Sequence, residues 1–199
     1  MELLLVSSPE DFAGEHTMVE ALFEMGLTRF HLRKPRHSAA MLERWVLGLN
    51  PDFHSQIVIH GHPEVARALN LLGFHMNAAW FETHPEPDSL LRSASAHSLE
   101  ELGKLPADLS YAWISPVFDS ISKTDYPSAF SLEELSGFLI KHHAESKVPV
   151  YALGGIDEDN LKAVAQAGFD GAVVLGSVWN HINPLHAWKR LVRARAVLR

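Results

Sequence analysis

The sequence predicts a single compact (β/α)8 barrel, a TIM barrel, over residues 1–199. Eight short apolar segments alternate with helical ones at roughly 25-residue spacing, which is typical of β-strand–helix units in a parallel sheet. A chain of 199 residues is close to the lower limit of ~200 residues for eight such units. The first strand lacks the glycine fingerprint of a dinucleotide-binding sheet, which disfavours the alternative of a doubly wound open sheet.

The first four units are recognised from apolar runs and from helix start signals. Strands are expected over residues 3–7, 29–34, 56–61 and 73–77. Helices are expected over residues 15–25, after the N-cap Ser38, and over residues 63–69, because apolar side chains recur there at helical spacing. The segment after residue 77 is rich in Pro, Glu and His and shows no pattern, so no helix is predicted in it.

The second four units follow the same rhythm. Strands are expected over residues 91–97, 111–118, 148–153 and 171–175. Helices are expected after the N-cap Ser98, from Ser131 to about Lys141, after the acidic segment 157–160, and over residues 186–198. No linker, repeat or low-complexity segment indicates a second domain.

Glycine-containing loops follow the last two strands. Gly154 and Gly155 come after strand seven, and Gly176 and Ser177 come after strand eight. Such loops leave backbone N–H groups accessible to an anion, and the last two βα loops of a barrel frequently bind phosphate. The alternative is a tight turn without a ligand. The presence of both loops favours phosphate binding.

Composition narrows the classes of partner and compartment. The formal net charge is −7 and no basic block offsets it, which argues against a nucleic-acid partner or an anionic membrane. There is no cysteine, so disulfides and thiolate chemistry are excluded. The apolar run at the N-terminus is too short for a signal peptide or a spanning helix. We therefore expect a cytoplasmic protein.

Histidine is unusually frequent, with 13 residues in the chain. His31, His60, His75 and His97 fall at or near the C-terminal ends of strands two to five, which meet at one mouth in a barrel. They could transfer protons or contact substrate, or three of them could bind a transition metal. They could also be polar lining residues of the barrel. Sequence spacing does not decide among these hypotheses, and no residue is assigned as a metal ligand.

Five segments at strand ends resemble one known family. They are His31-Leu-Arg-Lys, Gly73-Phe-His-Met, Ser95-Ala-His-Ser, Ser115-Pro-Val-Phe-Asp-Ser-Ile-Ser-Lys123 and Ala152-Leu-Gly-Gly-Ile156. In this order and spacing the chain resembles the thiamine-phosphate synthase and thiazole tautomerase (TenI-like) family, over almost its whole length. The resemblance implies an enzyme of thiamine biosynthesis. In the synthase, a thiazole phosphate nitrogen displaces pyrophosphate from a pyrimidine pyrophosphate, with Mg²⁺ holding the pyrophosphate.

The resemblance and the strand-end pattern together assign the candidate site residues. The expected catalytic residues are Arg33, Lys123, Ser120, Ser122, His75 and His97. The expected substrate- or phosphate-binding residues are Gly154, Gly155, Gly176, Ser177, His31, His60, Asn77 and Ser95. The expected partners are a small phosphorylated substrate and a second copy of the chain in a homodimer, for which the C-terminal helix with its tryptophan offers an interface.

Departures from the family pattern keep the activity open. His60-Gly61 stands where the synthase has Asn-Asp, and no carboxylate follows Asn77 until Glu82. Both aspartate ligands expected for Mg²⁺ are therefore absent, although synthase activity would imply that ion. Pro116 stands where the tautomerase has its catalytic histidine. The hypotheses are a synthase acting on a thiazole phosphate, a thiazole tautomerase, or a non-catalytic protein that binds a phosphate ligand.

Overall fold

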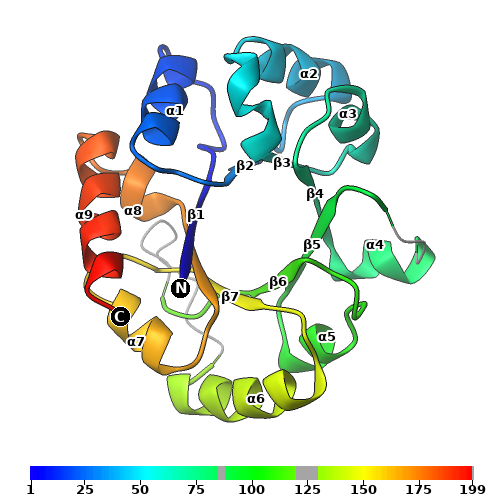
Figure 1. Cartoon of the computed structure of the whole chain (residues 1–199), viewed down its shortest axis with the longest axis vertical. Helices are drawn as coiled ribbons and strands as arrows, with labels where there is room; N and C mark the ends of the chain where they lie inside the picture. Colours follow the sequence, from blue (N-terminus) through cyan, green and yellow to red (C-terminus); the bar gives the residue numbers. More distant parts are fainter. Residues whose placement is uncertain (85–87, 120–129, 199) are drawn as a thin grey trace.

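A computed structural model of the chain shows a closed barrel of eight parallel strands, each paired with the next and β8 paired with β1 (Figure 1). It describes residues 1–84, 88–119 and 130–198. The helices form a ring around the barrel (Figure 1). The predicted (β/α)8 fold is confirmed.

The strands lie close to their expected positions. They are β1 Glu2–Val6, β2 Phe30–Leu32, β3 Ile57–His60, β4 Gly73–Asn77, β5 Leu91–Ala96, β6 Tyr111–Ile114, β7 Val150–Leu153 and β8 Gly171–Val174. The helices are α1 Glu15–Glu24, α2 Ala39–Leu47, α3 Pro63–Ala68, α4 Ala78–Thr83, α5 Leu99–Gly103, α6 Leu132–Glu145, α7 Leu161–Gln166, α8 Gly176–Trp179 and α9 Pro184–Ala196, with a 3-10 helix η1 at Pro51–Gln56.

Strand alternation divides the apolar residues between two cores. Side chains such as Phe30 and Ile59 point outward and pack under the helices, whereas the barrel interior is filled by a separate cluster. This inner cluster consists of Leu4, Val6, Tyr111, Trp113, Tyr151 and Val173. Because the interior is packed, chemistry is confined to the ends of the barrel.

A polar group closes the N-terminal end of the barrel. Arg29 forms an ion pair with Glu2 at 3.3 Å, and its guanidinium lies 4.7 Å from the centroid of the Tyr111 ring. Tyr151 donates a hydrogen bond to Glu2 and stacks on Tyr111. These contacts link the four side chains to one another, so we assign this end a structural role.

Several expected boundaries are wrong, for local reasons. β6 ends at Ile114 instead of continuing to residue 118, because Pro116 has no N–H to donate to a ladder. Helix α4, which was not predicted, begins directly after β4, where Asn77 Oδ1 accepts a hydrogen bond from Trp80 N at 2.9 Å. β8 ends at Val174, one residue before its expected end, and α8, which was not predicted either, begins at Gly176.

The C-terminal helix α9 packs against α1, α7 and α8 (Figure 1). Its Trp188 is 1% exposed, so the apolar face that was expected to form a dimer interface covers the chain's own barrel instead. That argument for the homodimer is wrong, and the homodimer itself stays a prediction. None of the described helices has the length and hydropathy needed to cross a membrane.

Candidate functional site at the barrel mouth

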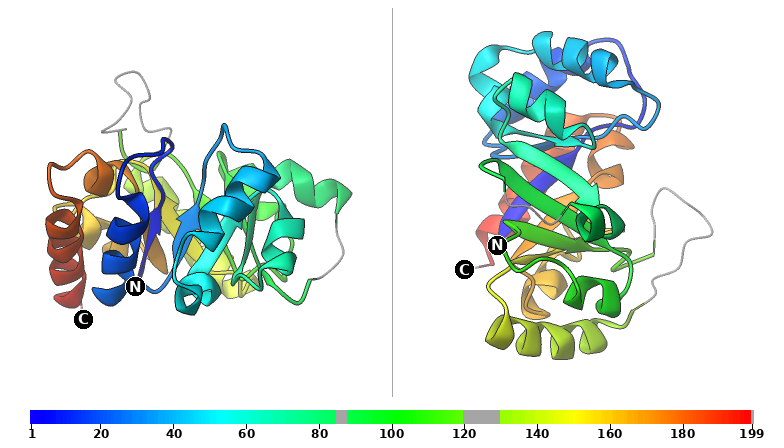
Figure 2. Two further views of the ribbon diagram at one scale, coloured as in Figure 1. Left: turned by 90° about the horizontal axis from the view of Figure 1, so that it is seen from above. Right: turned by 90° about the vertical axis from the view of Figure 1, so that its right-hand side faces the viewer.

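All eight strands are parallel, so their C-terminal ends and the loops that follow them lie at one end of the barrel, at the top of the left view in Figure 2. The described candidate residues divide into two groups at this end. Histidines gather on the side of β2, β3 and β4. Glycines and a serine follow β7 and β8. Ser120, Ser122 and Lys123 lie outside the described residues, so their catalytic assignment stays a prediction.

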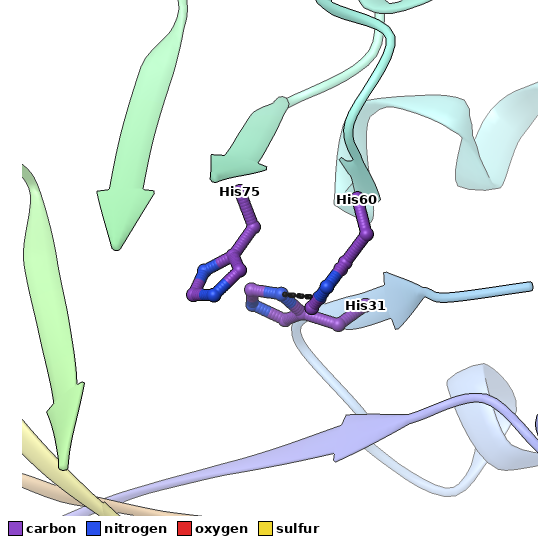
Figure 3. Close-up of side chains that lie close together, drawn as sticks. All are labelled: His31, His60 and His75. Carbon is purple, nitrogen blue, oxygen red and sulfur yellow. Dashed lines mark hydrogen bonds between the residues drawn. The ribbon is translucent and has the colours of Figure 1, made fainter. Parts of the chain in front are cut away.

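His31, His60 and His75 come together inside the barrel (Figure 3). Alternation explains this, because Phe30 and Leu32 on either side of His31 face the helices. His60 and His75 are cross-strand neighbours, and their rings stack with centroids 4.4 Å apart. His31 Nδ1 and His60 Nε2 are hydrogen-bonded at 3.1 Å. One nitrogen from each ring lies within 4.8 Å of the other two.

His31 and His75 are buried, and each of them also has a hydrogen-bond partner outside the group of three histidines. His31 Nε2 is hydrogen-bonded to the Tyr111 hydroxyl at 2.7 Å, and His75 Nδ1 to Ser93 Oγ at 2.8 Å. The Trp113 ring contacts all three imidazoles, with its centroid 4.1 Å from that of His75. Tyr111, Ser93 and Trp113 were missed by sequence reasoning. Their only signal was alternation with a period of two along β5 and β6.

Burial keeps the three imidazoles neutral. Desolvation, and next the Arg33 charge, lower the pKa of His75 to about 3. The pKa values of His31 and His60 lie well below the usual value. Desolvation is the largest cause for both residues, and the neighbouring His75 is the next largest. The trio therefore presents uncharged nitrogen donors at neutral pH.

The other histidine predicted for the mouth does not join this group. His97 is exposed, and its Nδ1 lies 3.2 Å from the carbonyl oxygen of Ser115. Ser95 is half-buried at the end of β5. Asn77 is exposed, and its Oδ1 already caps α4. The substrate contacts of these residues stay predictions.

Two basic residues after β2 point in different directions. Arg33 is exposed, and its backbone N–H and carbonyl are both hydrogen-bonded to Ser7 Oγ at 2.9 Å. Lys34 is buried and donates to the Glu15 carboxylate at 2.7 Å. Trp45 Nε1 donates to the same carboxylate at 3.0 Å. Lys34 is thus a structural cation between β2 and α1, and Arg33 is the cation available to a ligand.

The loop after β7 is shaped by its two glycines. Gly154 has φ +103° and Gly155 has φ +63°, a region that side-chain-bearing residues rarely adopt. A Cβ on Gly155 would lie 2.4 Å from the carbonyl oxygen of Asp119. Asn160 Nδ2 donates to the Gly155 carbonyl at 2.7 Å and fixes the turn. Both the backbone conformation of this turn and its close packing therefore require glycine.

Polar groups remain open beside this turn. Within the described part of the chain, the N–H groups of Gly154, Gly155, Gly176 and Ser177 donate no hydrogen bond. Ser177 Oγ is buried and has no partner among the described residues. Buried polar groups are nearly always paired in proteins, and an unpaired one calls for a ligand, a water or another explanation. A donor-rich concavity of this kind suits an oxyanion.

The described residues do not form a magnesium site. Mg²⁺ prefers carboxylate, phosphate and water oxygens in an octahedral arrangement. In residues 1–84, 88–119 and 130–198, the one group of three clustered potential ligands is His31, His60 and His75. These offer nitrogen, and Asn77 Oδ1 is engaged in capping. The donor set found here does not match the ion that the synthase pattern implies.

Comparisons with known proteins agree with the motifs. The family described as "Thiamine monophosphate synthase" matches residues 3–178. Thiamine-phosphate synthase of Desulfitobacterium hafniense (strain Y51) is 28% identical over 94% of this chain and 91% of its own. The thiamine-phosphate synthase of Streptococcus suis is 26% identical, and the match covers 88% of this chain and 80% of that protein.

Solved structures extend the likeness to three dimensions. Thiamine phosphate pyrophosphorylase from Bacteroides thetaiotaomicron is 33% identical, with a TM-score of 0.81 and coverage of 100% of both chains. The pyrophosphorylase from Pyrococcus furiosus, 22% identical with a TM-score of 0.77, covers 99% of this chain and 96% of its own and shares the fold. The match over residues 3–178, together with the five strand-end segments and the barrel fold, places this chain in the thiamine monophosphate synthase family.

Proposed function

We propose that the protein binds a thiazole phosphate at the mouth of the barrel and joins it to a pyrimidine pyrophosphate. The observation that carries the proposal is the set of open donors at Gly154, Gly155, Gly176 and Ser177. Four N–H groups and a hydroxyl from two adjacent loops can satisfy the oxygens of one phosphate. Relatives named as thiamine-phosphate synthases support the choice of ligand.

The coupling step requires stabilisation of the leaving pyrophosphate. The thiazole nitrogen lone pair forms the new C–N bond as the C–O bond breaks, and the bonding electrons leave with pyrophosphate. Negative charge therefore grows on phosphate oxygens, and fixed cations stabilise it. Arg33, held at the end of β2 by Ser7, is assigned to this role. Lys123, with the hydroxyls of Ser120 and Ser122, is assigned to it from the sequence pattern.

His75 and His97 are proposed to contact the substrates, and their roles differ because their surroundings differ. His75 is buried and neutral, so it can accept or donate a hydrogen bond without carrying charge. His97 is exposed and can reach a substrate from the rim. His31, His60, Asn77 and Ser95 complete the proposed substrate contacts on the β2–β5 side.

A second candidate is an isomerase of the tautomerase type, or a protein that binds the phosphate ligand without turnover. The histidine cluster favours it, because three imidazoles occupy the side of the mouth where the synthase pattern expects carboxylates for Mg²⁺. Both candidates share the phosphate-binding loops. They differ only in whether a pyrophosphate is released.

The test combines a binding and a turnover measurement on the full chain. The protein is mixed with the thiazole phosphate, the pyrimidine pyrophosphate and Mg²⁺, and released pyrophosphate is measured. Lys123→Ala should abolish the release, whereas Lys141→Ala, an exposed lysine in α6, should leave it unchanged. Thiazole-phosphate binding without any release would select the second candidate. If the thiazole phosphate does not bind, both candidates fail.

A further inference from the structure

We propose that His31, His60 and His75 form a binding site for one divalent transition-metal ion of the Zn²⁺ class, with an open fourth position. The three side chains project from successive strands toward one point in the barrel (Figure 3). None of them belongs to the phosphate-binding loops, so this inference does not rest on phosphate binding. A bound ion would replace the direct substrate contacts proposed above for these three histidines.

The distances are close to those of a metal centre. Zn–N bonds of about 2.0–2.1 Å in a tetrahedron place neighbouring nitrogens about 3.3 Å apart. His31 Nδ1 and His60 Nε2 are already 3.1 Å apart. The three candidate nitrogens lie within 4.8 Å of one another, so a small rotation of the side chains would bring all three onto one ion.

The outer hydrogen bonds select the nitrogens that face the ion. Metal-bound histidines generally donate their second ring N–H to a neighbouring oxygen, which fixes the ring orientation. Tyr111 is bonded to Nε2 of His31 and leaves Nδ1 for the metal. Ser93 is bonded to Nδ1 of His75 and leaves Nε2. Two of the three ligands therefore already have the oxygen partners that metal-binding histidines use.

Charge and burial favour an ion with nitrogen ligands. The imidazoles are uncharged at neutral pH, so metal binding releases no net proton. The proton in the hydrogen bond between His31 Nδ1 and His60 Nε2 must first move to the other nitrogen of its own ring. Two arginines oppose the added positive charge, Arg33 near His60 and His75 and Arg29 near His31. The Arg33 side chain is exposed and water screens it, and Arg29 is paired with Glu2. Neutral imidazoles suit Zn²⁺, Co²⁺ or Ni²⁺ and suit Mg²⁺ poorly.

An open fourth position also agrees with the surroundings. Three protein ligands leave a zinc ion with room for water or a substrate oxygen. Trp113 contacts all three imidazoles, and its buried Nε1–H has no acceptor in the described part of the protein. An oxygen ligand on the ion would bring a hydrogen-bond acceptor close to the Trp113 ring.

The experiment is a Zn²⁺ titration of chelator-treated, full-length protein in competition with a chromophoric chelator. We expect one ion per chain, and His60→Gln should weaken the affinity at least 100-fold. Two matched controls should bind as the wild type does. His97→Gln removes the exposed histidine of the mouth. His181→Gln disrupts the pair of His181 and His186, whose ring centroids are 5.9 Å apart. X-ray absorption on the zinc-loaded wild type should show three imidazole ligands.

The outcomes separate the proposal from adventitious binding. Absence of a stoichiometric ion, an affinity that His60→Gln leaves unchanged, or an affinity lost in His181→Gln would each overturn the site. Should His60→Gln fail to fold, the absorption spectrum of the wild-type complex decides. A shell of six oxygens, or one with fewer than three imidazoles, refutes the assignment.

Discussion

The two sides of the barrel mouth use their polar groups in opposite ways. On the β2–β4 side, three buried polar side chains have polar partners: His31 pairs with Tyr111, His75 with Ser93 and Lys34 with Glu15. On the β7–β8 side, Ser177 Oγ and the glycine N–H groups have no partner in the described part of the chain. Removing a paired group should therefore cost stability, whereas removing an open group should cost ligand binding.

The largest effect is expected for Lys34→Ala, on the paired side. The substitution leaves the Glu15 carboxylate, which is 3% exposed, buried without its cation, and such a loss costs about 3–5 kcal/mol in the free energy of unfolding. Urea denaturation measures it. Lys104→Ala, which breaks the exposed pair with Glu100, is the control and should have no measurable effect. Equal effects from the two variants would refute the structural role of Lys34.

The next largest effect is expected for Gly155→Ala, in the turn that carries the open groups, because this position has a left-handed backbone conformation. A left-handed conformation costs a residue with a side chain about 1–2 kcal/mol, and the contact with Asp119 O adds about 1–2 kcal/mol of overpacking. The affinity for the thiazole phosphate should fall together with the stability of the protein, and calorimetry measures this affinity. Gly137→Ala in α6 meets no atom within 4 Å and should instead stabilise the helix by about 0.5–1 kcal/mol. A stable Gly155→Ala protein with full affinity would contradict the geometry of the loop.

The paired side should also make stability depend on pH. In metal-free protein, His75 has a pKa of about 3 when folded and 6.5 as its ordinary value, so the unfolded chain binds more protons between these values. Stability is fully present above the ordinary value and falls as the pH drops, by about 2 kcal/mol between about pH 7.5 and about pH 5. Unfolding of the wild type and of His75→Gln at the two pH values measures the difference. Parallel pH profiles would show that His75 does not contribute.

The smallest change in stability is expected for Ser177→Ala, on the open side. Its hydroxyl is unpaired in the ligand-free protein, so its removal should leave stability unchanged or raise it by about 1 kcal/mol. Phosphate-ligand affinity should nevertheless fall about ten-fold, because one hydrogen bond to a charged group is lost. Ser110→Ala is the matched control, because Ser110 directly precedes β6 and therefore lies at the opposite end of the barrel from Ser177. A loss of stability without a loss of affinity would place Ser177 among the paired groups.

The barrel was predictable from the sequence because its signals are local. Ser38, Ser98 and Ser131 cap their helices as predicted, and the apolar strands follow from their flanking turns. The short helices α4 and α8 were not predicted. Six and four residues are too few to establish a helical repeat, and no start signal was recognised for them, unlike for the equally short α5 and α7.

The site was predictable only in part, because its contacts join residues distant in sequence. Strand ends and glycines indicated the histidines and the loops after β7 and β8. The partnership of His31 with Tyr111 spans 80 positions, and the exclusion of His97 from the trio depends on barrel geometry. Trp113 resembled an ordinary core residue until its three imidazole neighbours were located.

The most direct measurement of the central claim compares one ligand with and without its phosphate. Calorimetry with the thiazole phosphate and with the corresponding thiazole alcohol reports how much the β7–β8 side contributes. We predict that the phosphate ester binds at least 100-fold more tightly, and that Ser177→Ala reduces this advantage about ten-fold. Equal affinities for the two ligands, or an advantage that Ser177→Ala leaves intact, would contradict a phosphate site in these loops.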